Sequence, residues 1–476
     1  MKYNEAQPMV SHYEILNETT VIILAAGTGS RMRSQTPKVL HKVAGLCLLE
    51  YALLVPKSLK ISDVRVVLNS RISAMPEIEQ LSSKYDFCVI IQEKQLGTGD
   101  AVRSAIEHST PKKFILVMYA DAPFLKGETV LKLLSNLSRY AVSLLTFNAK
   151  DPSGYGRIIA RSKQNTELSL SHMFELQNAD YTQVTEMEMD IENIVEDCDA
   201  TERQKQIKLC NGGTIAFTRE IALDFIKNNK PSAIGEYYMT NIVSFTSSNG
   251  GNAKGLLVDE AEVLGINDKI QLAHAEALMQ NTLREFWMMQ GVTMIDPASV
   301  FLSYDTIFGS DVTIHPNVYI GQNVSIGSNV TIFSFSHIEG AKVDNECFIG
   351  PFSRIRPTTR LHTGAKVGNF VEVKNSEIGS ITKVMHLAYI GDTLIEDNVN
   401  IGAGVVFCNY NGKTKSKCRV GSESFIGSNT SIVAPRDIGK NTTIGAGSVI
   451  TSDVPDNNLA VGRATQKNLT KTRFQK

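Results

Sequence analysis

The stretch that decides the fold runs from Ile314 to Ile332 and reads IHPNVYIGQNVSIGSNVTI, with isoleucine at every sixth position. The same spacing recurs at further aliphatic residues: Ile338, then Ile349, Ile355, Leu361, Val367 and Val373, then Val420, Ile426, Ile432, Ile438, Ile444 and Ile450. A period of six matches neither an α-helix nor a β-strand. It is typical of a coil with short flat sides, in which each aliphatic residue points inward and stacks on the next coil. The spacing therefore predicts a parallel β-helix rather than an ordinary sheet with accidental spacing.

Two further details of the repeat carry information. Glycine often follows the inward residue, at Gly321, Gly327, Gly350 and Gly368. We expect this small residue to permit the corner of the coil. The period slips around Ile378, Ile390 and Ile401. Because a purely structural coil needs no such departures, we expect functional residues where the period breaks.

Upstream of the repeat, apolar strands alternate with segments of helical length. The expected strands are Val21 to Leu24, Val64 to Leu68, Cys88 to Ile91 and Phe114 to Met118. This alternation is typical of an α/β domain with a mostly parallel sheet. A helix from Asp268 to Gln290, capped by Asn267 and ended by Gly291, is expected to connect the two parts. The polar, acidic stretch from Ser162 to Glu196 is predicted as a surface excursion outside the core.

These elements predict four segments. They are an N-terminal extension at 1–18, an α/β domain at 19–266, a linker helix at 267–291, and a β-helix domain with a C-terminal tail at 292–476.

Composition excludes several classes of protein. The chain has 476 residues, 42% hydrophobic and 20% charged, and a net charge of -1, which disfavours disorder and a polybasic nucleic-acid surface. No run approaches the roughly 18 apolar residues that cross a bilayer, and the first residues lack the layout of a signal peptide. We therefore expect a cytoplasmic protein without membrane insertion. The seven scattered cysteines lack Cys-x-x-Cys spacing, which indicates reduced thiols and no zinc site.

The first expected strand runs directly into a loop of small residues, Ala25-Ala26-Gly27-Thr28-Gly29-Ser30-Arg31-Met32, which is followed by Pro37-Lys38. Small residues let backbone N–H groups approach a polyphosphate, and the two basic side chains can neutralise its charge. The loop is not a dinucleotide fingerprint, because Met32 stands at the third glycine position, and it is not a P-loop. By itself it could also be a tight turn with solvated basic residues.

Two neighbouring features favour the phosphate-binding interpretation. The segment Gln95-Leu96-Gly97-Thr98-Gly99 follows another strand, and Asp121 lies just past the end of the strand Phe114 to Met118. Open α/β sheets bind their ligands at the carboxyl ends of parallel strands. A carboxylate at that edge is a hard oxygen ligand suited to Mg2+.

These motifs carry a resemblance. The run Leu24 to Gly27, Arg31, Pro37-Lys38 and Asp121 resembles the sugar-1-phosphate nucleotidyltransferases. Further matches are Asp151-Pro152-x-Gly154-Tyr155-Gly156-Arg157, Gly235-Glu236-Tyr237-Tyr238 and Gly265-Ile266-Asn267. With them the chain resembles the bifunctional N-acetylglucosamine-1-phosphate uridylyltransferases/glucosamine-1-phosphate acetyltransferases. The resemblance implies a Rossmann-like α/β nucleotidyltransferase domain followed by a left-handed parallel β-helix of hexapeptide repeats. Position 120 departs from the family, with alanine where glycine is usual.

The resemblance implies a first site that takes UTP and a sugar phosphate. Its nucleotide- and sugar-binding residues would be Leu24, Ala25, Gly27, Lys38, Gln92, Gly97, Thr98, Tyr119, Asp121, Gly156, Glu196, Asn211 and Asn267. Arg31 and Lys38 would act on the phosphates. Asp121 and Asn267 would hold Mg2+, and the sugar would lie against Gly156, Glu196 and Asn211.

The resemblance implies a second site for acetyl transfer in the repeat region. His386 would be the catalytic base, because imidazole is suited to proton transfer near pH 7, and Glu372 would assist it. Arg356, Lys374, Tyr389 and Asn400 would bind glucosamine-1-phosphate. Asn409, Tyr410, Ser428, Ala446 and Arg463 would bind acetyl-CoA, with Lys415 as a further phosphate ligand. A lone histidine is more often structural, so this assignment depends on the surrounding matches.

The function implied is synthesis of UDP-N-acetylglucosamine from glucosamine-1-phosphate, acetyl-CoA and UTP, through N-acetylglucosamine-1-phosphate. The resemblance further implies a homotrimer with acetyl-transfer sites shared between subunits. Two alternatives remain. One is a monofunctional nucleotidyltransferase with a non-catalytic, trimerising β-helix, and the other is a sugar-nucleotide sensor without turnover.

Overall fold

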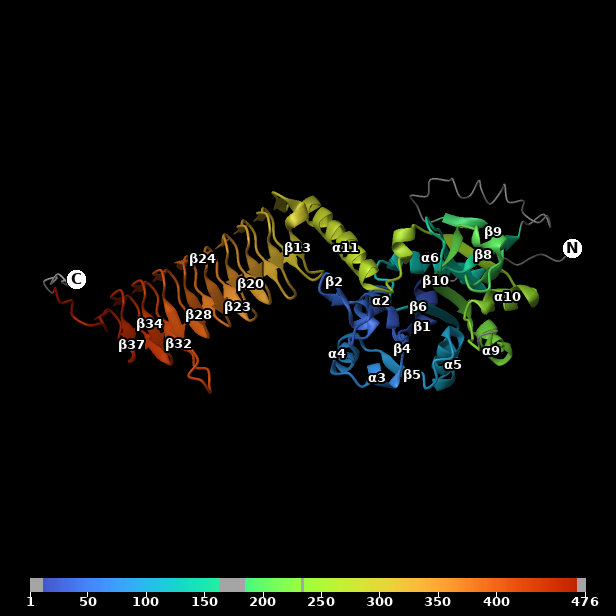
Figure 1. The fold of residues 1–476 in the computed structure, drawn as a ribbon, viewed down its shortest axis with the longest axis horizontal. Helices are drawn as coiled ribbons and strands as arrows, with labels where there is room; N and C mark the ends of the chain where they lie inside the picture. Colours follow the sequence, from blue (N-terminus) through green and yellow to red (C-terminus); the bar gives the residue numbers. More distant parts are fainter. Residues whose placement is uncertain (1–11, 162–184, 233–234, 469–476) are drawn as a thin grey trace, which may run out of the picture. The chain divides into compact units, whose positions relative to one another are not determined.

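The structure, a computed structural model, describes residues 12–161, 185–232 and 235–468. The chain forms two compact units, residues 1–275 and 276–476. The division falls inside helix α11 (Lys269–Met289), so the predicted linker helix belongs partly to each unit (Figure 1). Its bounds lie within one residue of those predicted from the sequence.

The first unit is built on a nine-stranded sheet in the order β5-β4-β1-β6-β10-β7-β11-β9-β8. Its strands are β1 (Thr19–Leu24), β4 (Asp63–Leu68), β5 (Cys88–Ile91), β6 (Phe114–Tyr119), β7 (Val142–Asn148), β8 (Arg157–Arg161), β9 (Thr185–Val195), β10 (Leu209–Thr218) and β11 (Ala253–Leu257). A separate hairpin pairs β2 (Lys42–Val43) with β3 (Leu46–Cys47). The pairings show that β9 and β10 run antiparallel to the other strands of the sheet. The predicted mostly parallel sheet and its four expected strands are confirmed.

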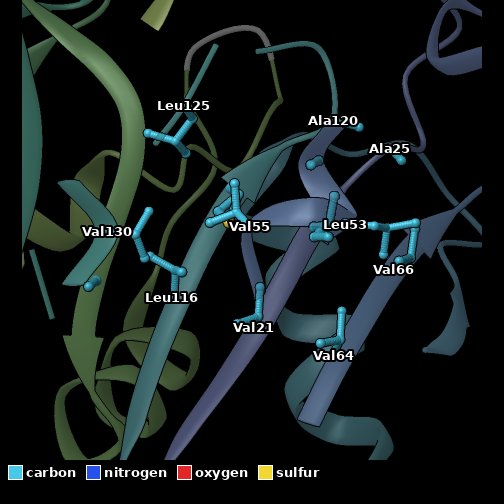
Figure 2. Close-up of a cluster of buried hydrophobic side chains, with 14 of the residues drawn as sticks. Val21, Ala25, Leu53, Val55, Val64, Val66, Leu116, Ala120, Leu125 and Val130 are labelled. Atoms are coloured by element: carbon cyan, nitrogen blue, oxygen red, sulfur yellow. The ribbon is translucent and has the colours of Figure 1, made fainter. Parts of the chain in front are cut away.

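Helices cover both faces of this sheet. They are α1 (His12–Asn17), α2 (Leu48–Ser58), α3 (Ser70–Ser73), α4 (Pro76–Tyr85), α5 (Thr98–His108), α6 (Gly127–Ser135), α8 (Glu202–Lys205), α9 (Arg219–Asn228) and α10 (Asn241–Ser248). Short 3-10 turns are η1 (Ser30–Met32), η2 (Lys38–Leu40), η3 (Asn136–Ser138) and η4 (Glu260–Val263). Alternate residues of β1 enter different cores, because side chains on a strand alternate between its faces. Val21 and Ile23 join the cluster that includes Leu53 of α2, shown in Figure 2, whereas Ile22 joins the cluster beneath α5.

Two predictions about this unit are corrected by the structure. The stretch from Ser162 to Glu196 is not wholly a surface excursion, because its last part forms β9 inside the sheet, with Ile191 and Ile194 buried. Residues 162–184 of that stretch lie outside the described residues. The predicted N-terminal extension is also part of the domain from residue 12 onward, since Ile15 of α1 belongs to the core cluster beside β1.

The second unit is a parallel β-helix whose short strands stack into three sheets, here called faces 1, 2 and 3. Face 1 holds β12 (Thr293–Met294), β15 (Thr313–Ile314), β18 (Thr331–Ile332), β21 (Phe348–Ile349), β24 (Lys366–Asn369), β27 (Lys383–His386), β30 (Asn400–Ile401), β33 (Phe425–Ile426), β36 (Thr443–Ile444) and β38 (Leu459–Ala460). Face 2 holds β13 (Phe301–Leu302), β16 (Tyr319–Ile320), β19 (His337–Ile338), β22 (Arg354–Ile355), β25 (Glu372–Lys374), β28 (Tyr389–Gly391), β31 (Val406–Cys408), β34 (Ser431–Val433) and β37 (Val449–Ile450). Face 3 holds β14 (Ile307–Phe308), β17 (Ser325–Ile326), β20 (Ala341–Val343), β23 (Thr359–Leu361), β26 (Glu377–Ile378), β29 (Thr393–Ile395), β32 (Cys418–Val420) and β35 (Arg436–Ile438). The turn η5 (Pro297–Ser299) precedes the first strand of face 2.

The sixfold period is explained by this geometry. The predicted inward residues, such as Ile314, Ile332 and Ile426, are each at most 5% exposed and form the interior of the coil. Contrary to our prediction, Gly321, Gly327 and Gly368 do not take the left-handed conformation of a corner, whereas Gly350 does, with φ of +97°. A Cβ on Gly321 would lie 2.6 Å from Glu339 Cγ, so this glycine permits one coil to stack on the next. The left-handed conformation is taken by asparagine at several turns, as at Asn323 with φ of 57°, and by other residue types at others, as at Phe352 with φ of 56°.

Most breaks in the period fall at one turn of the coil, between face 2 and face 3. The first coil departs from it at another turn, because Met294 of face 1 and Leu302 of face 2 are eight residues apart. The inward residues that bracket this turn are Ile338 and Val343, Val373 and Ile378, Ile390 and Ile395, and Phe407 and Val420. The first three pairs are one residue short of the period, and the last contains an inserted loop. Side chains displaced by these breaks therefore gather along one edge of the β-helix.

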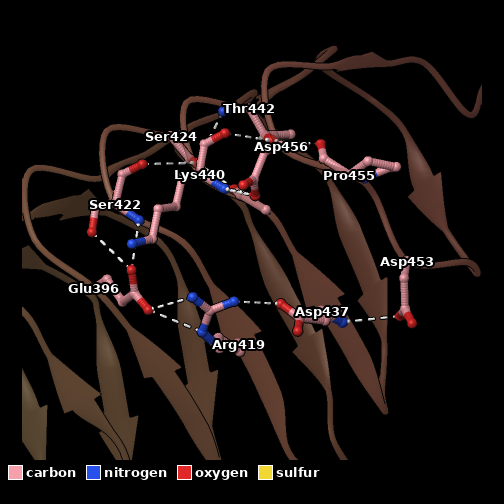
Figure 3. A network of polar contacts seen from close by, with 11 residues as sticks. Glu396, Arg419, Ser422, Ser424, Asp437, Lys440, Thr442, Asp453, Pro455 and Asp456 are labelled. Atoms are coloured by element: carbon pink, nitrogen blue, oxygen red, sulfur yellow. Dashed lines mark hydrogen bonds and ion pairs between the residues drawn. The ribbon is translucent and has the colours of Figure 1, made fainter.

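Polar side chains also link successive coils. Arg419 Nη1 donates to Asp437 Oδ1 at 2.8 Å, and its Nε donates to Glu396 Oε1 at 2.9 Å (Figure 3). The Ser422 backbone N–H and hydroxyl both donate to Glu396 Oε2, at 3.0 and 2.8 Å. Both oxygens of the Glu396 carboxylate are thus bonded by the next coil.

All seven cysteines fall within the described residues, and each is a free thiol, as predicted. Within the described ranges, no helix combines the length and the apolar character that a bilayer crossing requires.

Candidate active sites

A cavity of about 510 Å³ opens at the carboxyl ends of β1 and β6 in the first unit. Its walls are Leu24, Ala25, Ala26, Gly27, Thr28, Lys38, Val39, Gln92, Gln95, Gly97, Thr98, Ala101, Tyr119, Asp121, Glu196, Glu236, Tyr238 and Asn267. Most of the residues predicted to bind a nucleotide therefore line one cavity. Its position agrees with the rule for open α/β sheets, because parallel strands present their carboxyl ends at one edge.

The charged centre of this cavity is a three-residue cluster. The Lys38 ammonium group forms an ion pair with Asp121 Oδ2 and donates a hydrogen bond to Asn267 Oδ1 at 3.1 Å. Asp121 Oδ2 and Asn267 Oδ1 thus both contact the same positive charge. The pair of ligands suits Mg2+, which usually takes one or two protein carboxylates and completes its shell with phosphates and water. Among the described residues there is no cluster of three or more His, Cys, Asp or Glu that could hold a metal without such help.

Backbone contacts place Asn267 beside Asp121. The Ile266 N–H donates to the Asp121 carbonyl at 3.0 Å, so the two segments lie against one another. The predicted cap of α11 is corrected here: Asp268 Oδ1, not Asn267, accepts from the Gln271 N–H at 2.8 Å. Because Asp268 takes the capping position, the Asn267 side chain is available to face Lys38.

The loop after β5 is held by close backbone packing. Tyr237 exchanges hydrogen bonds with it, since its N–H donates to the Leu96 carbonyl at 2.8 Å and its carbonyl accepts from the Gly99 N–H at 2.7 Å. A Cβ on Gly97 would lie 2.7 Å from that same carbonyl, and Gly97 has φ of +105°. Gln92, whose Nε2 donates to the Gly97 carbonyl at 3.2 Å, fixes the loop from the other side. The motif that contains Gly97 and the motif that begins at Gly235 therefore pack against each other as one structural unit.

The loop after β1 presents its backbone to the cavity. Gly27 lines the cavity, and a Cβ built on it would meet nothing within 4 Å, so its backbone is open to a ligand. Gly29 has φ of +62°, and a Cβ there would lie 2.7 Å from Lys38 Cβ, so glycine is needed for Lys38 to approach. Arg31, predicted to act on phosphates, is exposed on η1 and is not among the residues that line the cavity.

The predicted sugar-binding residues also come together. A Cβ on Gly156 would lie 3.5 Å from Glu196 Oε2 and 3.7 Å from Asn211 Cβ. Thr240 Oγ1 donates to Glu196 Oε1 at 2.6 Å. Burial raises the pKa of Glu196, against the effect of this hydrogen bond. Burial, with the nearby charges of Glu196 and Asp121, likewise raises the pKa of Tyr119, which keeps this phenol protonated.

Some lining residues were not predicted individually. Gln95 Nε2 donates to the Ala26 carbonyl at 3.0 Å and joins the two loops of the cavity. Glu236 and Tyr238 line the cavity from the segment that packs on Gly97. The sequence signal for them was the motif that begins at Gly235. Ala120, the departure from the family, has its methyl group in the core and is 1% exposed, so the extra carbon is accommodated there.

In the second unit, the predicted acetyl-transfer residues lie along two turns of the coil. His386 ends β27 at the turn between faces 1 and 2. Ser428 and Ala446 follow strands of face 1 at the same turn, and Arg463 Nη1 donates to the Ala446 carbonyl. His386 Nδ1 lies 2.7 Å from Asn369 Oδ1 of the preceding coil. Asn400 lies on face 1, in β30.

Arg356, Lys374, Asn409 and Tyr410 lie at the other end of face 2, where the period breaks, whereas Glu372 and Tyr389 are the first residues of β25 and β28 on that face. Arg356 Nη1 donates to Glu372 Oε1 at 2.8 Å. Contact with the Lys374 ammonium group and its charge lower the pKa of Lys415, so these two lysines converge. A Cβ on Gly391 would lie 2.6 Å from both the Tyr389 hydroxyl and Asn409 Nδ2, which places these two groups side by side. Tyr410 is exposed, and its hydroxyl donates to the Gly412 carbonyl at 2.6 Å.

Comparison with known proteins defines the family. The model of the MobA-like NTP transferase domain matches residues 21–169, and that of the bacterial transferase hexapeptide (six repeats) matches residues 417–452. The bifunctional protein GlmU of Zymomonas mobilis subsp. mobilis is 41% identical over 462 residues, which cover 94% of this chain and 95% of the relative. The chain belongs to the GlmU family. The GlmU proteins of Azorhizobium caulinodans (38% identical, 94% of each chain) and Ruegeria sp. (39% identical, 94% of this chain and 95% of the relative) match over similar lengths.

Membership of the GlmU family confirms the predicted fold and the predicted combination of activities. The chain is a bifunctional uridylyltransferase and glucosamine-1-phosphate acetyltransferase that makes UDP-N-acetylglucosamine. The GlmU relatives match both halves of the chain. The β-helix therefore corresponds to a transferase domain of these relatives and is not only a scaffold.

Proposed function

We propose that the two activities are carried out by the residues described above, with uridylyl transfer in the β1/β6 cavity and acetyl transfer along face 2 of the β-helix. The observation that supports this most directly is the convergence of Lys38, Asp121 and Asn267 in a cavity lined by two glycine loops. We further propose UTP and N-acetylglucosamine-1-phosphate as the substrates of this cavity.

In the uridylyl step, a phosphate oxygen of N-acetylglucosamine-1-phosphate attacks the α-phosphorus of UTP, and the bond to pyrophosphate breaks. The protein must position two anions and neutralise their charge, and no covalent nucleophile is required. The glycine loop and Lys38 serve the phosphates, while Gln92 and Gly97 face the base. Asp121 and Asn267 would hold Mg2+, which neutralises charge on the phosphates. Arg31 remains a predicted phosphate ligand at the edge of this site.

In the acetyl step, the amine of glucosamine-1-phosphate attacks the thioester carbon of acetyl-CoA, and CoA leaves as the thiol. His386 is suited to take the amine proton. Because Asn369 Oδ1 is an acceptor, the proton of a neutral His386 ring lies on Nδ1. Nε2 then carries the free lone pair that a base requires. Arg356 and Lys374 supply positive charge for the sugar phosphate, and Ser428, Ala446 and Arg463 extend the site for acetyl-CoA.

We also propose that the protein is a cytoplasmic homotrimer. Exposed phenylalanines form a ladder at the turn that carries His386: Phe335 stacks on Phe352 at 4.9 Å, and Phe352 on Phe370 at 5.1 Å. These residues are between 45% and 55% exposed, and contiguous exposed apolar surface of this kind marks interaction sites. Covering this ladder with a second copy would bring another chain next to His386. The separation of the predicted acetyl-transfer residues over two turns supports a site shared between subunits.

The test of the proposal is the release of free thiol from acetyl-CoA, with and without glucosamine-1-phosphate. We expect release that depends on this sugar phosphate, followed by pyrophosphate release when UTP is added. Absence of thiol release from folded protein would leave the β-helix as a scaffold. Absence of pyrophosphate release would contradict the assignment of the cavity.

A further inference from the structure

A ladder of four polar side chains runs along the turn between faces 2 and 3, and only Asn409 among them has been assigned to the site so far. Thr358 Oγ1 donates to Asn375 Oδ1 at 2.7 Å, Asn375 Nδ2 donates to Asp392 Oδ1 at 2.5 Å, and Asn409 Nδ2 donates to Asp392 Oδ2. Each step spans 17 residues, so the ladder uses the shortened coils at this turn. Asp392 is the only carboxylate of the four.

Asp392 holds both ends of the inserted loop that breaks the period. Its carboxylate binds Asn409, at the start of the loop, and its backbone carbonyl accepts from the Cys418 N–H at 3.2 Å, at the end. The Ser416 N–H closes the loop on the Asn409 carbonyl at 2.8 Å. Asp392 and Asn409 are each only 7% exposed, so water competes little for this contact. The loop carries Tyr410 and Lys415.

The contact also fixes which way the Asn409 amide faces. Since Nδ2 donates to Asp392, the Asn409 carbonyl oxygen is directed away from that carboxylate. Nδ2 lies beside the Tyr389 hydroxyl over Gly391, where any Cβ would clash. Burial raises the pKa of Asp392, but hydrogen bonds from Asn375 and Asn409, with the charges of Lys374 and Lys415, outweigh it and lower the pKa overall. Asp392 is therefore an anion at neutral pH, and it balances the two converging lysines.

We propose that Asp392 is a positioning residue for acetyl transfer, which anchors the 409–417 loop, orients the Asn409 amide, and offsets the charge of Lys374 and Lys415. This inference rests on the proposed function, because it assumes that Asn409, Tyr389 and Lys374 belong to the acetyl-transfer site. Asp392 acts through these residues and does not need to touch a substrate.

The test is Asp392→Asn, which keeps the shape of the side chain but removes its charge and one acceptor oxygen. We expect kcat of acetyl transfer to fall by about 10- to 100-fold, because small displacements in a site of this kind cost that much. The KM for glucosamine-1-phosphate should stay the same or decrease, since the two lysines then lack their counter-charge. If Asp392 only stabilises the fold, its replacement should loosen the β-helix and raise the KM, with little change in kcat.

The matched control is Asp344→Asn. Asp344 also binds side chains of the next coil, since Arg360 Nη2 donates to its Oδ2 at 3.0 Å, but it lies at a different turn. We expect this control to leave acetyl transfer within twofold of wild type. Uridylyl transfer on N-acetylglucosamine-1-phosphate reports on the first unit of both variants and should not change.

The outcomes separate the two proposals. Wild-type protein without thiol release dependent on glucosamine-1-phosphate would refute the proposed acetyl-transfer site itself. An active wild type together with an Asp392→Asn variant that keeps kcat within twofold would refute the positioning role alone. If Asp392→Asn does not fold, Asn375→Ala removes the other amide donor and leaves Asp392 in place. We expect it to lower kcat in the same direction but less, and an unchanged kcat would overturn the inference.

Discussion

Asp121 is the residue on which the uridylyl site depends most. It is the only carboxylate that contacts Lys38 in the described structure, and its backbone carbonyl holds the segment of Asn267. We expect Asp121→Ala to lower uridylyl transfer by roughly 10³-fold, because it removes charge neutralisation worth several kcal/mol. Acetyl transfer, measured as thiol release by the same preparation, should stay at the wild-type rate. Loss of both activities in folded protein would contradict two independent sites.

His386 should show the reverse behaviour. Replacing it by alanine removes the proposed base, and general-base catalysis contributes about 10²- to 10⁴-fold. We expect kcat of acetyl transfer to fall within that range, while pyrophosphate release from UTP and N-acetylglucosamine-1-phosphate is unchanged. Asn369→Ala is the informative companion, since it leaves the imidazole but removes the acceptor that fixes its tautomer. A smaller loss in Asn369→Ala than in His386→Ala supports the orientation argument, and no loss would contradict it.

At this scale, the sequence predicted which residues gather but not how they contact each other. The motifs around Gly27, Lys38 and Asp121 pointed to one phosphate site, and they do line one cavity. That Asp268 rather than Asn267 caps α11 was not predictable, because adjacent Asn and Asp are equally good caps.

The elements around the cavity are joined by packing that tolerates no side chain at Gly97. We expect Gly97→Ala to be destabilising by about 1–3 kcal/mol, since its positive φ is strained for alanine and the Cβ would collide with the Tyr237 carbonyl. Relief of that collision would move the 96–99 loop away from Tyr237. The expected result is a large rise in KM for UTP with acetyl transfer unaffected.

Gly154→Ala is the control for that variant. It also has positive φ, of +81°, but a Cβ there meets nothing within 4 Å. The thermal unfolding of Gly154→Ala should show the destabilisation from backbone strain alone. Its KM for UTP should not change. Equal KM values for the two variants would contradict the packing argument.

The polar network of the β-helix predicts a dependence of stability on pH. Burial raises the pKa of Glu396, but hydrogen bonds from Ser422 and Arg419 outweigh it, so that its pKa is lowered from the ordinary value of 4.5. A depressed pKa means that the contribution to stability is complete above about pH 4.5 and is lost as the pH falls toward the folded value. Glu396→Gln should lower Tm at pH 7 by roughly 2–4 °C, equivalent to about 1 kcal/mol for a unit of this size.

The Tm difference between wild type and Glu396→Gln should shrink in acid below pH 4.5, because the wild-type carboxylate is then protonated as well. Glu423→Gln, at an exposed residue of the next coil, should show no such convergence. A constant difference at all pH values would assign the effect of Glu396→Gln to packing.

Why the sequence missed β9 is also a question of elements. Ile191 and Ile194 are both buried although they are three residues apart, which breaks the alternation that identifies a strand. The register of β9 shifts against β11 between Lys254 and Leu256, and that of β8 against β9 between Ile159 and Ala160. Such irregularities change which side chains face the core, so the strand cannot be recognised there from an alternation of apolar and polar residues.

For the whole molecule, the β-helix was predictable because each coil repeats one rule, with an aliphatic residue inward at each face. The α/β sheet was predictable only in its parallel half, since β10 and β9 depend on long-range pairing that a local pattern does not encode. The sequence showed that the period slips. It did not show that the slips between Ile338 and Val420 share one turn, because each repeat can be assigned to a face only once the path of the coil in three dimensions is known.

Subunit assembly provides the last prediction, because the two activities should differ in their dependence on it. Phe352 is the middle of the exposed phenylalanine ladder, and Phe352→Glu would place charge between two stacked rings. If the ladder is covered by another copy, burying that charge is unfavourable by several kcal/mol, which exceeds what a modest interface tolerates. We therefore expect monomers by light scattering and loss of acetyl transfer, whose site we propose to be shared between subunits. Uridylyl transfer, whose cavity is complete within one chain, should persist.

Phe425→Glu, at an exposed phenylalanine outside the ladder, is the control and should remain trimeric. A trimeric, fully active Phe352→Glu variant would place the subunit contact elsewhere on the β-helix.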